Sequence, residues 1–333
     1  MLGLGLDLNL NVATKPIKTV DPSVVYDTLV IGAGPAGLNA ALYAKRKGLL
    51  VGVVAERIGG QVLDTAFVEN WLGTNRITGE GLMKTYEDHV REYEVPVTGD
   101  VRVEKIINGD IKQLQTSNGT VYQARTLVIA TGTMPRKLGV PGEERLTGRG
   151  VSYCAICDGS FFAGQNVIVV GGGNAAVGAA IDLARIAKSV HVVQRSAMRA
   201  DKVLLDRLQA QANVTISLRT QIVEIKGEDT VTGVRLLNTE TGTETTEAVD
   251  GVFIEIGHNA RTDCMKGFID LDAHGEVIIN EKGETSVPGI FAAGDVTTVP
   301  YKQIVIAAAE GAKAALRVNE YINRRTGGIP SPA

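Results

Sequence analysis

The chain has 333 residues, of which 44% are hydrophobic and 21% are charged, and its formal net charge is −3. At about 150 residues per domain, this length predicts two domains, each large enough for its own core. The nearly neutral charge argues against a nucleic-acid-binding surface, and three cysteines are too few for a secreted disulfide framework. Because no apolar run reaches the roughly 20 residues of a membrane-spanning helix, and 1–22 resembles an N-terminal extension rather than a secretion signal, we expect a cytoplasmic protein without a membrane partner.

The first half carries a glycine-rich turn between an expected strand and an expected helix. Residues 26–31 form a buried strand pattern, the turn GAGPAG follows at 32–37, and 38–47 has helical composition. Glycines in such a turn let the backbone approach a pyrophosphate at the helix N-terminus. A second strand over 50–54 is followed by Glu56, whose carboxylate suits a ribose hydroxyl. This combination predicts a dinucleotide site.

The next stretch is rich in glycine and amide side chains. Gln61 and Asn70 can hydrogen-bond the edge of a flat heterocycle, or they can cap their own loops. We expect a helix over 78–93, hairpins over 101–122 and a buried strand over 127–132. That strand ends in small residues, which suits the close approach of a cofactor.

A Cys-X-X-Cys segment, CAICDG, begins at Cys154. Two cysteines at this spacing can close a disulfide or open to a dithiol, and a helix start favours the thiolate. Asp158 follows directly and is placed to move a proton on or off a sulfur. The alternatives are a zinc site and a purely structural pair, but zinc needs about four ligands, and the remaining cysteine, Cys264, has no Cys-X-X-Cys or His-X-X-X-His near it. We therefore expect redox chemistry at Cys154 and Cys157, and no metal.

The strand–turn–helix pattern restarts after the cysteines. A strand is expected over 166–170, the turn GGGNAA follows at 171–176, and helix and strand patterns cover 176–187 and 189–193. Two such units predict two dinucleotide sites. One nucleotide can supply electrons while the other is a bound flavin, since a hydride needs a flavin before its electrons reach a disulfide.

The end of the strand over 189–193 bears on which nicotinamide is used. An acid there would repel a 2′-phosphate, but the position is the neutral Gln194, followed by Arg195, Arg199 and Lys202. Cations at this place suit a phosphate, which favours NADPH and leaves NADH possible. The alternative is that these charges belong to a solvated helix start.

The remaining chain alternates strands and helices. Asp295 ends an expected strand, where it can hold a polyol hydroxyl or cap a turn. The start of the helix that follows can stabilise negative charge on a reduced ring. The tail over 326–333 carries glycine, proline and serine and is expected to be mobile. The elements expected here are a helix over 201–211, strands and turns over 215–249, strands over 250–256 and 289–295, and a helix over 305–323.

Taken in order, these motifs resemble the low-molecular-weight thioredoxin reductase family of FAD-dependent pyridine nucleotide-disulfide oxidoreductases, from Tyr26 to about Tyr321. The matching motifs are GAGPAG at 32–37, ATG at 130–132, CAICD at 154–158 and Gly-Asp at 294–295. Two further stretches, ERIGGQVLDT at 56–65 and TTVPYKQI at 297–304, are similar to the flavoproteins of alkyl hydroperoxide reductase systems. Those flavoproteins carry an additional N-terminal thioredoxin-like region, where this chain has only 1–25. The resemblance therefore implies a separate thioredoxin-like carrier if a peroxiredoxin is served.

The resemblance implies an α/β fold with two Rossmann-like dinucleotide-binding domains, the nicotinamide domain being inserted into the FAD domain. The expected boundaries are 23–135 with 256–333 for FAD and 136–255 for NAD(P), the latter carrying the Cys-X-X-Cys segment. A rotation of the inserted domain is also implied, about hinges near 132–138 and 255–259. A homodimer is usual for the family.

By the family's mechanism, NAD(P)H reduces FAD, FAD reduces the Cys154–Cys157 disulfide, and Cys154 attacks the disulfide of a thioredoxin-like or glutaredoxin-like protein. Cys157 is implied to face the flavin, with Asp158 as the general acid–base. The residues implied to hold FAD are Gly32, Gly34, Pro35, Ala36, Gly37, Glu56, Gly60, Gln61, Asn70, Ala130, Thr131, Gly132, Gly294, Asp295, Lys302, Gln303 and Ile304. Those implied to hold NAD(P)H are Gly171, Gly173, Asn174, Ala175, Gln194, Arg195, Arg199, Ile256 and Gly257.

The nicotinamide motifs depart from the family pattern. Thioredoxin reductases have a His-Arg-Arg cluster followed by Arg-Ala, whereas this chain has Gln-Arg-Ser at 194–196 and Met-Arg-Ala at 198–200. Relatives with such eroded motifs take electrons from ferredoxin or another donor. Two alternatives therefore stay open: a ferredoxin-fed reductase, and a flavin-containing redox sensor whose cysteine pair switches with little turnover.

Overall fold

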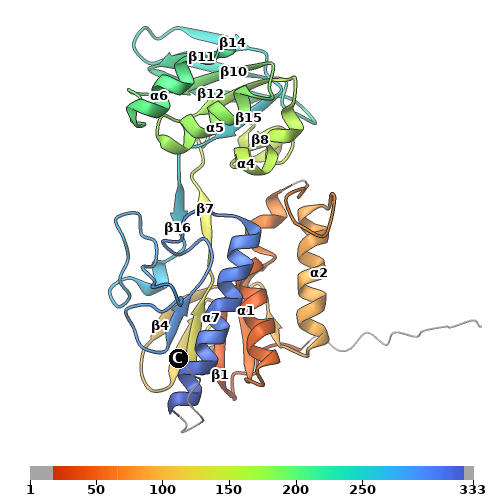
Figure 1. Ribbon diagram of the computed structural model, residues 1–333, viewed down its shortest axis with the longest axis vertical. Coiled ribbons are helices and arrows are strands. Elements are labelled where there is room, and N and C mark those ends of the chain that lie inside the picture. The colour runs from red at the N-terminus through yellow and green to blue at the C-terminus, as the bar shows by residue number, and fades with distance from the viewer. Residues whose placement is uncertain (1–17, 66, 326–333) are drawn as a thin grey trace, which may run out of the picture.

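The computed structural model describes residues 18–65 and 67–325, and consists of two sheet-based parts joined by a narrow connection (Figure 1). Most of the predicted N-terminal extension and the tail over 326–333 lie outside the described residues. Residues 18–20 are described and run beside a short strand, where the Val97 amide donates to the Lys18 carbonyl at 3.0 Å. The Val20 side chain is buried in the core of the larger part.

The larger part is built on one mixed sheet with the strand order β3-β2-β1-β6-β5-β4, and β17 pairs with β6. The four pairings β1–β2, β1–β6, β2–β3 and β17–β6 are parallel, whereas β4–β5 and β5–β6 are antiparallel hairpins. The strands are β1 (Val25–Ala33), β2 (Val51–Ile58), β3 (Val97–Thr98), β4 (Val103–Ile107), β5 (Lys112–Thr116), β6 (Val121–Ile129) and β17 (Ile290–Ala292).

Helices cover one face of this sheet, and long loops cover the other (Figure 1). Small side chains let α1 and α7 pack closely, since a Cβ at Gly311 of α7 would lie 2.0 Å from the Ala36 carbonyl oxygen of α1. The α- and 3-10 helices of the larger part are α1 (Pro35–Arg46), η1 (Gly60–Asp64), α2 (Gly79–Glu92), η3 (Asp263–Met265) and α7 (Ile304–Arg325).

The smaller part has an all-parallel sheet with the order β11-β10-β9-β15-β8. Apolar helix faces cover one side of it, and the three-stranded sheet β12-β13-β14 covers the other. Its strands are β8 (Val151–Ser152), β9 (Asn166–Val170), β10 (Ser189–Gln194), β11 (Val214–Leu218), β12 (Thr220–Lys226), β13 (Gly233–Asn238), β14 (Glu244–Glu247) and β15 (Gly251–Ile254). Its helices are α3 (Glu143–Leu146), α4 (Ala155–Asp158), η2 (Gly159–Phe162), α5 (Asn174–Ala184) and α6 (Lys202–Gln209).

The two parts are connected by a ribbon of two antiparallel strands, β7 (Thr133–Pro135) and β16 (His258–Ala260). Just beyond it, the buried carboxylate of Glu143 accepts hydrogen bonds from the Leu138 amide at 2.9 Å and the Gly139 amide at 2.7 Å. The same carboxylate accepts the Tyr153 hydroxyl at 2.9 Å. The connection is therefore tied to the residue that precedes Cys154.

The predicted α/β fold is confirmed, with one strand–turn–helix unit inserted into the other. The hairpins expected over 101–122 are present as β4, β5 and β6, because the Asn-Gly turns at 108–109 and 118–119 reverse the chain. Within the described residues, none of the helices has the length and apolarity needed to cross a membrane.

Candidate functional site

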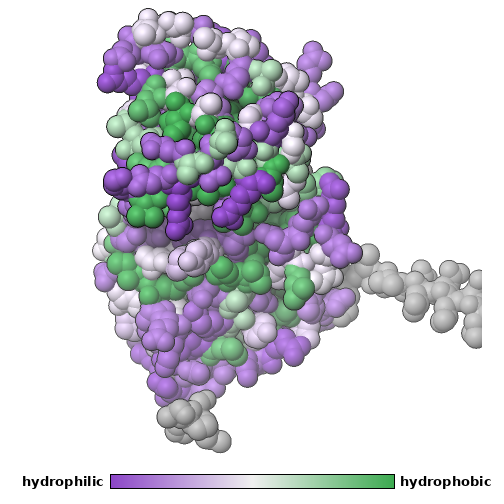
Figure 2. Space-filling view, turned by 45° about the horizontal axis from the view of Figure 1, so that its top comes forward, coloured by the Kyte–Doolittle hydropathy of each residue, from purple (hydrophilic) through white to green (hydrophobic). Residues whose placement is uncertain are grey.

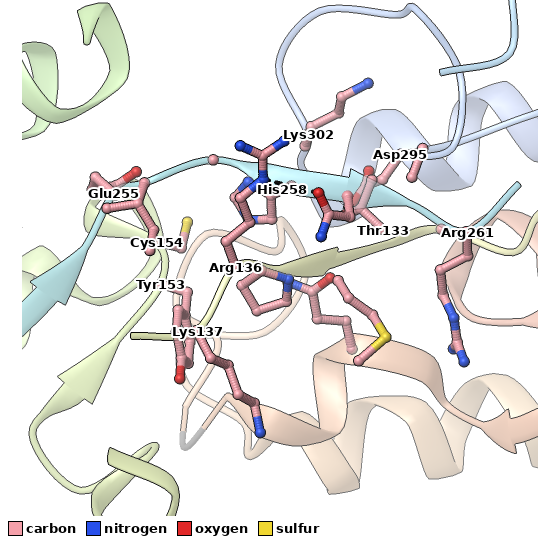
Figure 3. Close-up of a pocket in the computed structure, with 18 of the residues that line it drawn as sticks. Thr133, Arg136, Lys137, Tyr153, Cys154, Glu255, His258, Arg261, Asp295 and Lys302 are labelled. Atoms are coloured by element: carbon pink, nitrogen blue, oxygen red, sulfur yellow. Dashed lines mark hydrogen bonds between the residues drawn. The ribbon is translucent and has the colours of Figure 1, made fainter. Parts of the chain in front are cut away.

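Both glycine-rich turns and the cysteine pair line one cavity of about 1870 Å³. The space-filling view shows the surface hollowed where the two parts of the molecule meet (Figure 2). The close-up shows Cys154 and Glu255 at one end, Asp295 and Arg261 at the other, and the connecting strands with Arg136 and His258 between them (Figure 3). The cavity thus runs from the larger sheet to the redox segment.

The first turn has the geometry of a phosphate cradle. Gly32 has φ +109°, and a Cβ there would lie 2.2 Å from the Ala130 carbonyl oxygen. A Cβ at Gly34, by contrast, would meet no heavy atom within 4 Å, because the residue faces the open cavity. Pro35 starts α1, and Pro35 and Ala36 both line the cavity, so the N-terminal end of this helix adjoins the same space. A diphosphate fits where a side chain at position 34 would otherwise project.

Gly37 and Gly294 are predicted cofactor residues that do not line the cavity. A Cβ at Gly37 would lie 1.8 Å from the Gly32 carbonyl oxygen, and one at Gly294 would lie 2.8 Å from the Ala36 Cβ. Both glycines instead allow the turn, the start of α1 and the end of β17 to pack closely behind the cavity wall.

Glu56, at the end of β2, forms a salt bridge to Arg261, which follows the connecting strand β16. The Arg261 amide donates to the Gly132 carbonyl at 3.0 Å, and the Thr131 hydroxyl donates to the Arg261 carbonyl at 2.8 Å. The side chain of Glu56 is 43% exposed and lines the cavity.

Asn70 and Gln303 meet although they are far apart in the sequence. The Asn70 amide donates to the Gln303 side-chain oxygen at 3.1 Å, and both residues line the cavity. Lys302, at the same rim, forms a salt bridge to Glu276 at 3.2 Å and donates to the Thr297 carbonyl. The amide groups therefore converge from two loops, as a polar edge for a heterocycle requires.

Asp295 is a deeply placed carboxyl in the cavity wall. Burial raises its pKa to about 6, and the nearby Lys302 opposes that shift. No hydrogen bond from a described residue is among the causes that shift its pKa. A buried carboxyl facing a cavity suits a polyol hydroxyl as its hydrogen-bond partner.

The second turn repeats the geometry of the first. A Cβ at Gly171 (φ +145°) would lie 2.4 Å from the Glu255 carbonyl oxygen, whereas a Cβ at Gly173 would meet nothing within 4 Å. Asn174 begins α5, and its side chain exchanges two hydrogen bonds with Asp201, at 2.9 and 2.8 Å. This turn too leaves space for a diphosphate.

Gln194, at the end of β10, is buried, and its side chain packs against Gly172. Arg195 and Arg199 are exposed, line the cavity and make no salt bridge to any described residue. The third cation of the sequence pattern, Lys202, pairs with Asp206 at 2.9 Å and does not line the cavity. Two of the three predicted cations thus face the second nucleotide region.

Cys154 and Cys157 form a disulfide with Cα atoms 5.3 Å apart. Cys154 is the N-cap residue of α4, and its Sγ accepts a hydrogen bond from the Cys157 amide at 3.2 Å. Both residues line the cavity, and so does Ile156 between them, whose side chain is 70% exposed. A donor to the Cys154 sulfur stabilises it as a thiolate when the pair is reduced.

Asp158 lies behind the disulfide rather than in the cavity wall. Its Oδ2 accepts the Ser152 hydroxyl at 2.6 Å, while its Oδ1 is buried and has no hydrogen-bond partner among the described residues. Burial raises the pKa of Asp158, and the Ser152 hydroxyl opposes this shift. A carboxyl that is neutral more readily than usual can give a proton to a nearby sulfur.

The cavity gathers every predicted site residue except Gly37, Gly294 and Asp158. The cavity is also lined by charged or titratable residues that the sequence analysis did not identify as site residues. Among them, Arg136, Glu255, His258 and Arg261 lie in or beside the connecting strands. No local motif marks these positions, because they join the site only through the pairing of β7 with β16.

The chain matches the family model of the pyridine nucleotide-disulphide oxidoreductases over residues 26–311. It is 42% identical to the F subunit of alkyl hydroperoxide reductase in Pseudomonas putida, over 95% of this chain and 62% of that protein. It is also 42% identical to a Bacillus subtilis protein called NADH dehydrogenase, over 90% of this chain and 59% of that one. The chain therefore spans about three-fifths of the length of these curated relatives.

Solved structures give the same result. The crystal structure of thioredoxin reductase from Streptococcus pyogenes superposes with a TM-score of 0.86 at 43% identity, covering 90% of this chain and 99% of that one. Open space at Gly34 and Gly173, together with the buried carboxyl of Asp295, fits FAD and a nicotinamide nucleotide. The chain belongs to the pyridine nucleotide-disulphide oxidoreductase family and is a thioredoxin-reductase-like, FAD-dependent member of it.

Proposed function

We propose that this protein passes electrons from NADPH through FAD and the Cys154–Cys157 pair to a thioredoxin-like or glutaredoxin-like protein. The observation that carries this proposal is a disulfide lining the same cavity as two phosphate cradles. A purely structural disulfide has no need for such a position. FAD, when bound, supplies the relay of two electrons between a hydride donor and a disulfide.

The surroundings of the two sulfurs support different roles for them. Cys154 receives the Cys157 amide at its sulfur, so it is the better thiolate, and we assign it the attack on the partner's disulfide. Cys157 is left to reform the disulfide from the flavin-facing side. Asp158, held by Ser152, carries the proton that a leaving sulfur takes up.

The nicotinamide region supports NADPH over NADH. The neutral Gln194 places no charge at the end of β10, and the exposed Arg195 and Arg199 can pair with a 2′-phosphate. NADH stays a second candidate, since Gln194 would not repel either nucleotide and one relative is named NADH dehydrogenase.

Two further parts of the proposal concern motion and assembly. The connecting strands β7 and β16 are the hinges about which we propose that residues 136–255 rotate relative to residues 23–135 and 256–333. Such a rotation would let the nicotinamide and the cysteine pair reach the flavin in turn. We also propose a homodimer in the cytoplasm.

A donor and acceptor matrix tests the proposal. The purified protein is mixed anaerobically with NADPH, NADH or reduced ferredoxin, and thiols are counted on thioredoxin and glutaredoxin acceptors. We expect the fastest thiol formation with NADPH and thioredoxin. If acceptor thiols form with reduced ferredoxin but with neither nicotinamide, the protein is a ferredoxin-fed reductase instead. If the donor is oxidised but no acceptor thiols form, the protein is a redox sensor instead.

A further inference from the structure

Glu255 is a partly buried carboxyl next to the Cys-X-X-Cys segment, and the function proposed above gives it no role. It follows β15 directly and lies at the start of the return connection to the larger part. Its backbone is fixed on both sides, since its amide donates to the Val170 carbonyl at 2.9 Å and its carbonyl packs against Gly171. The backbone of Glu255 therefore has a defined position, and a hydrogen bond to its carboxylate sets the direction of the side chain.

That direction is toward the Cys-X-X-Cys segment. The Glu255 Oε1 accepts a hydrogen bond from the Ala155 amide at 3.1 Å, and Ala155 is the residue immediately after Cys154. The close-up shows Glu255 and Cys154 at the same end of the cavity, which both residues line (Figure 3). Because the carboxylate accepts a hydrogen bond from the residue next to Cys154, its charge acts on the charge that the sulfur carries after reduction.

We propose that Glu255 is a second ionisable positioning residue of the redox pair, which binds a proton when the disulfide is reduced and releases it when the disulfide reforms. The inference rests on the proposed function for its electron source. Reduction breaks the S–S bond with two electrons, one sulfur takes a proton, and the other remains a thiolate. The Glu255 carboxylate then takes a second proton from solvent, which removes the repulsion between two adjacent negative charges.

Burial makes this exchange occur near neutral pH. It raises the pKa of Glu255 to about 7, and only the Ala155 amide opposes the shift. A thiolate beside the carboxyl raises that pKa further in the reduced protein. The charged and titratable groups on the surrounding elements are Tyr153 and Asp158 around α4, Asp182 on α5, Arg136 and Lys137 beside β7, and His258 on β16.

Glu255 and Asp158 are two carboxyls near the redox pair that lie in different places. Asp158 hydrogen-bonds the Ser152 hydroxyl behind the disulfide, away from the cavity. Glu255 lies on the cavity side and is joined to the chain that becomes β16. The protonation state of Glu255 thus changes with the redox state of the cysteine pair, at the residue where the chain begins its return to the larger part.

The test is a redox titration of the full-length, flavin-containing protein against dithiothreitol, from about pH 5 to about pH 9, with reduced cysteines counted by alkylation and mass. Glu255→Gln keeps an oxygen that can accept the Ala155 amide but cannot ionise. Glu281→Gln, at an exposed turn of the larger part, is the matched control. Cys264 contributes a constant label in all variants.

We expect Glu255→Gln and the wild type to share one reduction equilibrium constant below about pH 6, where Glu255 is neutral in both redox states. Above about pH 7 the Gln variant becomes easier to reduce, and the ratio of the two constants rises to about tenfold. The wild-type constant alone must also show an extra proton in this range, which needs no variant. A ratio that stays constant with pH overturns the inference, whereas a pair that dithiothreitol cannot reduce overturns the proposed function instead.

Discussion

The two glycine-rich turns have nearly the same backbone but different surroundings. Gly34 (φ −79°, ψ −172°) and Gly173 (φ −93°, ψ −179°) both stand before a helix, and a Cβ on either would meet nothing within 4 Å. The strands that end beside them differ, because β2 ends near the exposed carboxylate of Glu56 and β10 ends at the buried amide of Gln194. We therefore propose that the backbone of each turn sets where a diphosphate fits, and that the side chain at the strand end sets which ribose is accepted.

The largest expected effect comes from filling one cradle at a time. Because Gly34 has ordinary dihedral angles and open space, Gly34→Val should fold normally yet weaken FAD binding by about 100-fold or more. The matched Gly173→Val should keep its flavin and lose nicotinamide binding instead. The flavin-to-protein absorbance ratio and nicotinamide titrations measure both effects. Equal flavin loss in the two variants would contradict the assignment of one nucleotide to each turn.

The buried carboxyl of the first region should carry a pH-dependent cost in stability. The pKa of Asp295 is raised from 3.8 to about 6, so the folded chain holds a proton between these values that the unfolded chain has lost. Stability therefore falls as pH rises through this range. Asp295→Asn should raise the free energy of unfolding of flavin-free protein by about 3 kcal/mol above about pH 6, and leave it unchanged below about pH 4. Denaturant titrations check this, and an equal gain at both pH values would refute it.

At the second glycine-rich turn, two arginines should determine the preference for NADPH over NADH. Replacing both Arg195 and Arg199 by Ala removes the two exposed cations at the end of β10. We expect the KM for NADPH to rise about tenfold, which corresponds to the loss of one charge-assisted contact that is partly screened by solvent. The KM for NADH should stay nearly unchanged. Lys202→Ala is the control, because Lys202 is paired with Asp206. Equal loss with both nucleotides would show that these arginines do not read the 2′-phosphate.

The smallest effect is expected at the strand end of the first region. Arg261→Ala breaks the partly exposed salt bridge to Glu56, which contributes at most about 1 kcal/mol. FAD affinity should therefore change by no more than a few-fold, measured by flavin release at low and high salt. A loss as large as that of Gly34→Val would instead mean that Arg261 binds the cofactor directly.

The turns, the cysteine pair and the strand ends could be predicted because each is encoded within a short stretch. A buried strand, a glycine turn and an alanine-rich helix follow one another at 26–47 and again at 166–187, and local pattern suffices for both. Asn70 with Gln303, and Asn174 with Asp201, were not predicted as partners, since their contact depends on how distant loops meet. Glu255 and Glu143 were missed for the same reason, because no neighbouring residue signals that a lone glutamate will be buried against a distant backbone amide.

The most direct test of the account follows the electrons across the cysteine pair. One equivalent of NADPH is added anaerobically to the protein with excess oxidised thioredoxin, and thiols are counted on both proteins, with Cys154→Ser as the comparison. The account predicts two thioredoxin thiols for each NADPH consumed in the wild type and none in the variant. Thioredoxin thiols formed by Cys154→Ser at the wild-type rate would contradict the central role of the Cys154–Cys157 pair.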